Sequence, residues 1–316
     1  MKPLCCLALL ICAAFPLTGQ TLRLSIIGTD TSHAPAYANI LHDASRPDHV
    51  PGARIVAAFP GGSPDIESSA SRVEGFAKDL KEKHGVKIVS RIADLCAESD
   101  GILLLSVDGR KHLSQFKEAM ACKKPVFIDK PYAATWKDAL EIRRLAKEAG
   151  IPWFSTSSLR YADYVVELTG QATKGAVSWG PGPLENHHEL DLGWYAIHPI
   201  EALFTIMGPG CKKVSRTTGT HGEVLTGEWG DGRIGVVRTL WPAGGYGAVA
   251  FGEKDVKQSG ANPKFSYAPS LKWAIKMIKT GKAPLSNDVT MEIFAFMEAA
   301  NRSRKAGGAP QALPTW

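Results

Sequence analysis

Short apolar segments alternate with amphipathic segments over roughly the first half of the chain. Five apolar segments rich in β-branched residues are expected to form strands: residues 22–27, 54–59, 86–89, 101–106 and 125–128. Four segments with apolar residues on one face are expected to form helices: residues 33–42, 66–84, 111–121 and 134–149. Strands that are apolar on both faces are typical of a parallel sheet covered by helices. The strict alternation of strand and helix therefore predicts a doubly wound α/β fold.

The pattern changes after residue 151. Further strands are expected at 152–154, 175–179, 213–218, 223–229, 234–241 and 246–251, and further helices at 157–168, 195–207, 270–279 and 289–304. Strands that follow one another through glycine-containing turns favour an antiparallel or mixed sheet. We therefore predict a Rossmann-type domain over residues 21–150, followed by an α+β domain over residues 151–316. The mostly antiparallel sheet of the second domain is expected to serve substrate binding and to join copies of the chain into a homo-oligomer.

The first 20 residues form a separate unit. An unbroken apolar run from Leu4 to Phe15 follows a positively charged start, and residues 16–20 turn small and polar. This is the layout of a secretory signal peptide, and the apolar run is too short to span a bilayer as a helix. We expect export to the periplasm or out of the cell, with the cleavage site left open, and no stable membrane span.

The composition is that of a globular protein, with 44% hydrophobic and 22% charged residues. The formal charge of +6 is spread along 316 residues without a basic cluster interleaved with aromatic residues, so nucleic acid is not an expected partner. Beyond the signal segment, the wide spacing of Cys96, Cys122 and Cys211 fits neither a zinc site nor a disulfide framework. We expect these three residues to be buried as small apolar side chains.

Three segments, in this order, carry a resemblance to a known family. They are the strand and turn Leu22–His33, the pentapeptide Phe127–Pro131 (Phe-Ile-Asp-Lys-Pro), and the segment Gly193–Glu201 with His198 in it. Together with Gly281–Ser286 and the helix expected after it, they resemble the Gfo/Idh/MocA oxidoreductases, which include glucose–fructose oxidoreductase and inositol dehydrogenase. The resemblance covers nearly all of the chain after the signal segment. It implies NAD or NADP as cofactor and a small carbohydrate or polyol as substrate.

The same resemblance implies that Lys130 and His198 are catalytic. Lys130 stands at the lysine of the family's Glu-Lys-Pro motif, where its amine would face the ligand crevice, donate to a substrate hydroxyl and stabilise a developing alkoxide. His198 begins the His-x-x-acid part of a longer family motif, and an imidazole there would take the hydroxyl proton. Glu201 would share one helix face with His198. The substrate-binding residues implied in this way are Arg160, Tyr161, His198 and Glu201.

The turn after the first strand is the expected cofactor contact. A dinucleotide fingerprint uses three glycines, and this chain keeps Gly28 but has Asp30 at the second position and His33 at the third. The Asp30 carboxylate would repel a pyrophosphate, or would cap the following helix and occupy N–H groups that a phosphate needs. No acid ends the second strand to bind a ribose, and no arginine is expected nearby to bind a 2′-phosphate. The expected cofactor-binding residues are Gly28, Thr29, Asp30, Ser32, His33, Ser106 and Lys130.

Three functions are compatible with these residues. The leading one is an exported oxidoreductase that moves hydride between NAD(P) and a secondary alcohol of a sugar, cyclitol or related polyol. A non-catalytic carbohydrate-binding relative would keep the crevice without the nucleotide, and export in the unfolded state favours it because dinucleotide is scarce outside the cytoplasm. A metal-assisted lyase or hydrolase would use the potential ligands of Glu185–Asp191. Adjacent histidines do not easily reach one ion, so we expect a polar loop at the mouth of the site and no metal.

Overall fold

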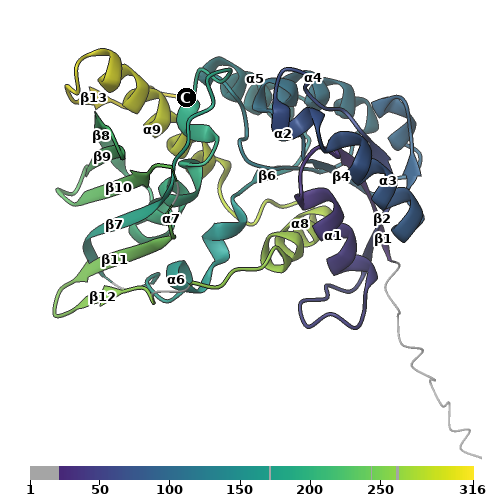
Figure 1. Ribbon diagram of the computed structural model, residues 1–316, viewed down its shortest axis with the longest axis horizontal. Coiled ribbons are helices and arrows are strands. Elements are labelled where there is room, and N and C mark those ends of the chain that lie inside the picture. Colours follow the sequence, from purple (N-terminus) through teal and green to yellow (C-terminus); the bar gives the residue numbers. More distant parts are fainter. Residues whose placement is uncertain (1–20, 171, 243, 261–262) are drawn as a thin grey trace, which may run out of the picture.

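Figure 1 shows the computed structural model, which describes residues 21–170, 172–242, 244–260 and 263–316. A helix-covered sheet built from the first half of the chain lies beside a second, larger sheet from the second half. The predicted signal peptide, residues 1–20, lies outside the described residues. Within the described ranges, none of the helices combines the length and the apolar character needed to cross a membrane.

The first sheet has six parallel strands in the order β3-β2-β1-β4-β5-β6. The strands are β1 (Leu22–Ile27), β2 (Ala53–Phe59), β3 (Lys87–Ile88), β4 (Gly101–Leu104), β5 (Val126–Ile128) and β6 (Trp153–Ser155). The strand order reverses between β1 and β4, and ligands bind beyond the carboxyl ends of the strands at such a point. The predicted doubly wound parallel sheet is confirmed, and β6 joins it although it follows residue 150.

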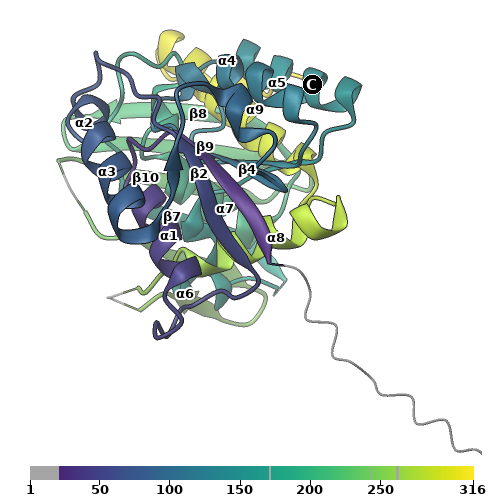
Figure 2. The same ribbon diagram turned by 90° about the vertical axis from the view of Figure 1, so that its right-hand side faces the viewer.

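Helices cover both faces of this sheet (Figure 2). On one side lie α1 (His33–His42), α3 (Val73–His84) and α8 (Ala268–Thr280), and on the other lie α4 (Gly109–Ala119) and α5 (Trp136–Ala149). Helix α8 follows most strands of the second sheet in sequence, yet Leu271 and Ala274 share one hydrophobic cluster with Leu24 and Ile26 of β1. One face of the first sheet is therefore covered in part by a helix from near the C-terminal end of the chain.

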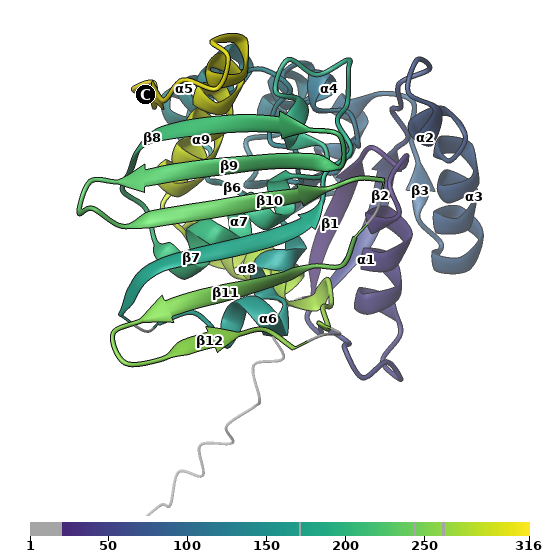
Figure 3. The same ribbon diagram turned by 60° about the vertical axis from the view of Figure 1, so that its left-hand side comes forward.

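The second sheet is mostly antiparallel, as predicted, in the order β12-β11-β7-β10-β9-β8-β13. Its strands are β7 (Thr173–Pro181), β8 (Cys211–Gly219), β9 (Gly222–Trp229), β10 (Ile234–Leu240), β11 (Gly247–Gly252), β12 (Val256–Gln258) and β13 (Gln311–Ala312). Helices α7 (Ile197–Met207) and α9 (Asn287–Lys305) pack on one face, and no helix of the described ranges covers the other (Figure 3). That a second copy of the chain covers this open face stays a prediction.

The segment predicted as one helix over residues 66–84 is split into α2 (Glu67–Ala70) and α3, with Arg72 as the N-cap of α3. The Ser69 hydroxyl donates to the Asp30 carboxylate at 2.6 Å and accepts from the backbone N–H of Ser63 at 2.7 Å. These bonds tie α2 to the turn after β1. The remaining short elements are η1 (Ile92–Leu95), η2 (Met120–Cys122), η3 (Ser158–Tyr161), α6 (Asp163–Val166) and η4 (Asp191–Gly193).

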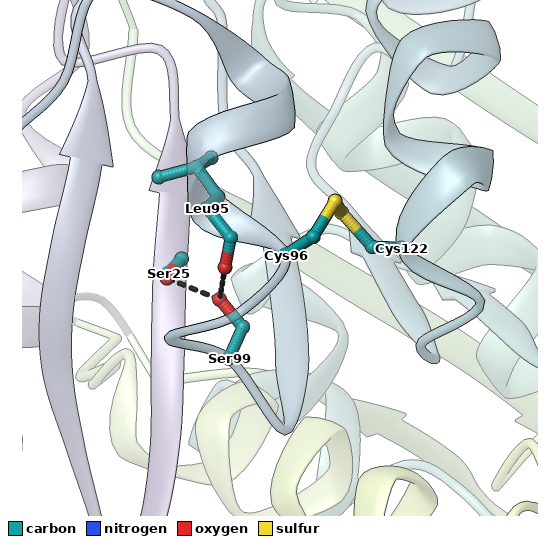
Figure 4. Close-up of a disulfide and its surroundings, with 5 residues drawn as sticks. All are labelled: Ser25, Leu95, Cys96, Ser99 and Cys122. Atoms are coloured by element: carbon teal, nitrogen blue, oxygen red, sulfur yellow. Dashed lines mark hydrogen bonds between the residues drawn. A yellow bond between two sulfur atoms is a disulfide. The ribbon is translucent and has the colours of Figure 1, made fainter.

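A disulfide joins Cys96 and Cys122 (Figure 4), so the expectation that both are unpaired apolar side chains is wrong. Cys96 follows η1 just before β4, and Cys122 ends η2 just after α4. A strand–helix crossover returns the chain beside its own start, which brings together two cysteines that are 26 residues apart. Cys211 is buried and free, as expected.

We expect the loss of this disulfide to lower the free energy of unfolding by about 3 kcal/mol, because the cross-link restricts the unfolded chain. Chemical denaturation of the Cys96→Ser variant beside the wild type measures the effect. The Cys96→Ser/Cys122→Ser double variant is the control and should be no less stable than the single variant. A single variant as stable as the wild type, or a peptide map without the linked pair, would contradict the prediction.

Candidate functional site

A cavity of about 540 Å³ lies where the carboxyl end of the first sheet meets the second domain. Its lining includes Ser32 and His33 from the start of α1, Arg72 from the α2–α3 junction, Lys130 after β5, and His198 from α7. A cavity of this size suits a small molecule or cofactor. The structure therefore brings four of the predicted site residues to one cavity and adds Arg72, which was not predicted.

Lys130 follows β5 and reaches the second domain. Its Nζ donates to the backbone carbonyl of Trp194 at 3.2 Å and lies 5.5 and 5.2 Å from the ring centroids of Trp194 and Tyr195, within range of cation–π attraction. Burial lowers the pKa of Lys130, while Asp129 opposes and Arg72 reinforces this effect. Across the described ranges no carboxylate forms an ion pair with Lys130, so its charge is available to a ligand.

His198 lies in the first turn of α7, on the second-domain wall of the cavity. Its Nδ1 is 2.7 Å from the hydroxyl of Ser157. Burial lowers the pKa of His198 well below its ordinary value, and the nearby Lys130 and His33 add to this effect. His198 is therefore neutral near pH 7. With the proton on Nδ1, its Nε2, which has no hydrogen-bond partner among the residues described, can accept a proton from a ligand hydroxyl.

Glu201 lies one turn further along α7 and does not line the cavity. Its carboxylate accepts hydrogen bonds from the backbone N–H of Ser157 and from Arg160 Nε, both at 2.7 Å. Because Ser157 also contacts His198, Glu201 fixes the segment that orients the imidazole. Arg160 and Tyr161 line a separate, mostly apolar cavity. Of the four predicted substrate-binding residues, the structure thus places His198 alone at the main cavity.

Gly28, Thr29 and Ser106 do not line the cavity either. The backbone N–H groups of Gly28 and Thr29 donate to the carbonyls of Phe59 and Pro60 at 2.9 and 2.8 Å, which extends the pairing of β1 with β2. Gly28 has a φ of +93°, and a Cβ there would lie within 2.5 Å of Ser106. This glycine therefore makes room for the segment after β4.

The Asp30 side chain is fully buried and does not reach the cavity. Its carboxylate accepts hydrogen bonds from the Ser69 hydroxyl at 2.6 Å and from the backbone N–H of Val107 at 3.3 Å. The N-cap of α1 is Ser32, without a side-chain cap bond. The expectations that Asp30 faces a pyrophosphate or caps α1 are both wrong, because neighbouring donors draw the carboxylate inward. The start of α1 stays open to the cavity.

His33, at the third fingerprint position, pairs with Asp129, the residue before Lys130. The His33 Nδ1 is 2.5 Å from the Asp129 carboxylate, and the two residues are 8% and 2% exposed. Tyr267 packs over the imidazole with 4.6 Å between ring centroids. The sequence placed His33 at the cofactor but did not predict this pair. The available signal for this pair was a double substitution. His33 stands where the fingerprint has its third glycine, and Asp129 stands where the family's Glu-Lys-Pro motif has glutamate.

The potential metal ligands of Glu185–Asp191 do not converge. Three of them bind in different directions: His187 pairs with Glu185 at 2.6 Å, His188 with Asp108 at 2.9 Å, and Asp191 with Arg216 at 3.0 Å. Within the ranges that the structure describes, no group of three or more such side chains is placed to hold a metal ion. Glu185 and His187 lie at the cavity lining, as expected for a polar loop at its mouth.

Asp108, the N-cap of α4, is fully buried and joins the two domains. Its carboxylate accepts from the Ser63 hydroxyl at 2.5 Å and from Arg110 Nη2 at 2.8 Å, and it lies 2.9 Å from Nε2 of His188. Burial by itself would raise the pKa of Asp108, but these hydrogen bonds lower it below its ordinary value. Asp108 therefore stays charged and holds the loop around His188 against the first domain.

The hydrophobic pattern did not single out Arg72. One long helix over residues 66–84 would have placed this arginine among many polar positions on a solvated face. The run of serines before it was the available signal, because serine hydroxyls compete for backbone hydrogen bonds and favour helix ends. The break between α2 and α3 brings Arg72 to the cavity instead.

Comparisons with known proteins agree with this geometry. Residues 22–156 match a family described as an oxidoreductase family with an NAD-binding Rossmann fold. Similar solved structures include myo-inositol dehydrogenase from Lactobacillus casei in complex with NAD(H) and myo-inositol, at 17% identity over 94% of this chain and 98% of that chain, with a TM-score of 0.72. A probable dehydrogenase from Thermotoga maritima is 19% identical over 92% and 99% of the two chains, also with a TM-score of 0.72. These likenesses show the fold. No match was found among curated protein sequences.

We expect His198 to make the native protein less stable as the pH falls below about 6.5. The unfolded chain binds a proton near that ordinary histidine pKa, whereas native His198 stays neutral until lower pH. Its contribution is therefore present above pH 6.5 and lost as the pH falls, at no more than about 1.4 kcal/mol per pH unit. Urea unfolding at pH 7 and pH 5 measures the loss, which His198→Asn should reduce.

The matched control for this titration is His221→Asn, because His221 is an exposed histidine away from the cavity. This variant should keep the wild-type drop in unfolding midpoint between the two pH values. An equal drop in the wild type and the His198→Asn variant would contradict the prediction.

Proposed function

We propose that this chain, whose residues 22–156 match the oxidoreductase family with an NAD-binding Rossmann fold, is an oxidoreductase of the Gfo/Idh/MocA type that transfers hydride between NAD(P) and a secondary alcohol of a sugar, cyclitol or related polyol. One observation carries the proposal: Lys130, which forms no ion pair with a carboxylate of the described residues, and the neutral His198 line one cavity at the carboxyl end of the parallel sheet. These are the two side-chain chemistries that the oxidation of an alcohol needs.

The residues at the cavity fit a dinucleotide. Asp30, the carboxylate expected to oppose one, is buried against Ser69. Ser32 and His33 at the start of α1 and the cation Arg72 line the cavity on the side of the first domain. These residues and Lys130 would hold the cofactor, which when bound supplies the acceptor or donor of the hydride.

The chain's own residues handle the proton and the charge. As the alcohol carbon gives up its hydride, the O–H bond breaks, the proton passes to Nε2 of neutral His198, and the electron pair left on oxygen forms the carbonyl bond. The Lys130 ammonium stabilises the negative charge that develops on that oxygen. Glu201 keeps the Ser157 segment in place, and Ser157 fixes the imidazole. In the reverse direction the same groups act in the opposite order.

The wall of the cavity supports a cyclic polyol as the substrate. Trp194, Tyr195 and Tyr246 line it beside His198, and aromatic faces pack against the apolar faces of a sugar or cyclitol ring. The Lactobacillus casei structure, similar in fold, contains myo-inositol. We therefore place cyclitols and pyranoses first among the substrates to be tested.

We expect Lys130→Met to reduce turnover at least a hundredfold, since removing one group that stabilises transition-state charge costs about that much. The assay follows NAD(P)H absorbance with a panel of cyclitols and pyranoses and with each cofactor. NADH binding, measured by fluorescence, should change far less than turnover.

Lys78→Met, which removes an exposed lysine of α3, is the control for this experiment and should retain turnover. If Lys130→Met turns over at the wild-type rate, Lys130 has no catalytic role. If the wild type reduces neither cofactor with any member of the panel yet still binds sugars, the protein is a non-catalytic carbohydrate-binding relative instead.

We also propose that the chain is exported. Residues 1–20 have the layout of a signal peptide, and the Cys96–Cys122 disulfide suits an oxidising compartment. The protein recovered from its native host should therefore begin near Thr21 and lie outside the cytoplasm, as N-terminal sequencing after cell fractionation would test. Leu9→Arg, which interrupts the apolar run, should leave the full-length chain inside. Wild-type protein that keeps Met1 and stays in the cytoplasm would contradict the proposal.

A further inference from the structure

We propose that Arg72 binds the pyrophosphate of the dinucleotide, in place of the glycines that this chain lacks. The proposal rests on the proposed function, because it takes the cavity to be a site for NAD(P). Arg72 lines the cavity together with Ser32, His33 and Lys130. The ligand class is a nucleotide diphosphate, and the residue is a binding residue with no role in the hydride transfer itself.

The guanidinium of Arg72 uses one of its three nitrogens for hydrogen bonding within the described residues. Its Nε donates to the backbone carbonyl of Ser68, and no hydrogen bond or ion pair from the described ranges engages its two terminal nitrogens. Asp65 lines the same cavity but is bound to Arg110 at 2.8 Å, and Glu67 lines it with an exposed side chain. Arg72 is thus a cation without a carboxylate partner at the cavity wall.

Two hydrogen bonds hold the segment around Arg72 against the turn after β1. The Thr29 hydroxyl donates to the carbonyl of Val73 at 2.9 Å, and the Ser69 hydroxyl donates to Asp30 at 2.6 Å. Arg72 lies between these two anchor points in sequence. In doubly wound folds this turn is where the pyrophosphate lies. The aspartate that replaces the second glycine therefore helps to hold a positively charged residue at the cavity beside this turn.

The surroundings of Arg72 favour an anion. A guanidinium can donate two parallel N–H bonds to phosphate oxygens, and the N-terminus of α1, whose Ser32 and His33 line the cavity, adds partial positive charge. The Ser68 hydroxyl is buried without a partner within the described residues, beside Arg72 at the cavity. Arg72 is also close enough to Lys130 to lower its pKa, so an anion bound near both cations would relieve their repulsion.

Binding of NADH, NADPH and ADP-ribose to the full chain tests the proposal, with fluorescence for the first two ligands and calorimetry for all three. All three ligands contain the pyrophosphate, and only NADPH carries a 2′-phosphate. Arg72→Ala should weaken all three by a similar factor, at least tenfold, and Arg72→Lys should restore part of the loss because a lysine keeps the charge without the bidentate geometry. Raising the salt concentration should weaken wild-type binding more than binding to Arg72→Ala.

Arg91→Ala, which removes an exposed arginine far from the cavity lining, should bind all three ligands as the wild type does. Arg72→Gln, which keeps part of the aliphatic stem and a polar end without the charge, serves if Arg72→Ala does not fold. Unchanged binding in the Arg72 variants overturns the proposal, and a loss confined to NADPH assigns Arg72 to the 2′-phosphate instead. If the wild type binds none of the three ligands, the proposed function itself fails and the role of Arg72 fails with it.

Discussion

A buried hydrogen-bond chain determines the shape of the cavity. It runs from Asp30 through Ser69 and Ser63 to Asp108, and from there to His188 of the second domain. Each of these residues is at most 4% exposed, and a buried carboxylate left without its partners is costly. The chain therefore fixes the turn after β1, the helix α2, the start of α4 and the loop of the second domain relative to one another. The wall that carries Arg72, next to α2, is held in place by it.

The departures from the dinucleotide fingerprint form a consistent set. Asp30 replaces a glycine and binds Ser69, and His33 replaces another and binds Asp129. In each case the side chain that replaces a glycine finds its hydrogen-bond partner inside the protein. The donors that glycines usually expose are replaced by a side-chain cation, Arg72, brought by the same rearrangement. Loss of a glycine pattern is thus compatible with an intact anion site.

The sequence predicted the fold best where the burial of apolar side chains alone decides the structure. Strands apolar on both faces specify a covered parallel sheet, so the first domain was predicted almost completely. Short strands such as β12 and β13 carry too few apolar positions to be recognised. The convergence of Lys130 and His198 followed from the order of motifs. The position of Arg72 could not be predicted, because it depends on serine hydroxyl bonds that interrupt a helix. The Cys96–Cys122 bond could not be predicted either, because it depends on a crossover that brings two distant cysteines together.

Helix α8 has a consequence for how the protein matures. It packs Leu271 and Ala274 against the apolar residues Leu24, Ile26 and Tyr37 of the first domain, although more than two hundred residues separate the two ends of this contact. Helices α1 and α3 of the same face emerge early, but the part of that face that α8 covers stays open to solvent until most of the polypeptide has emerged. The two domains therefore cannot reach their final state in order of synthesis. The first domain is thus completed by a segment that emerges only after six of the seven strands of the second sheet.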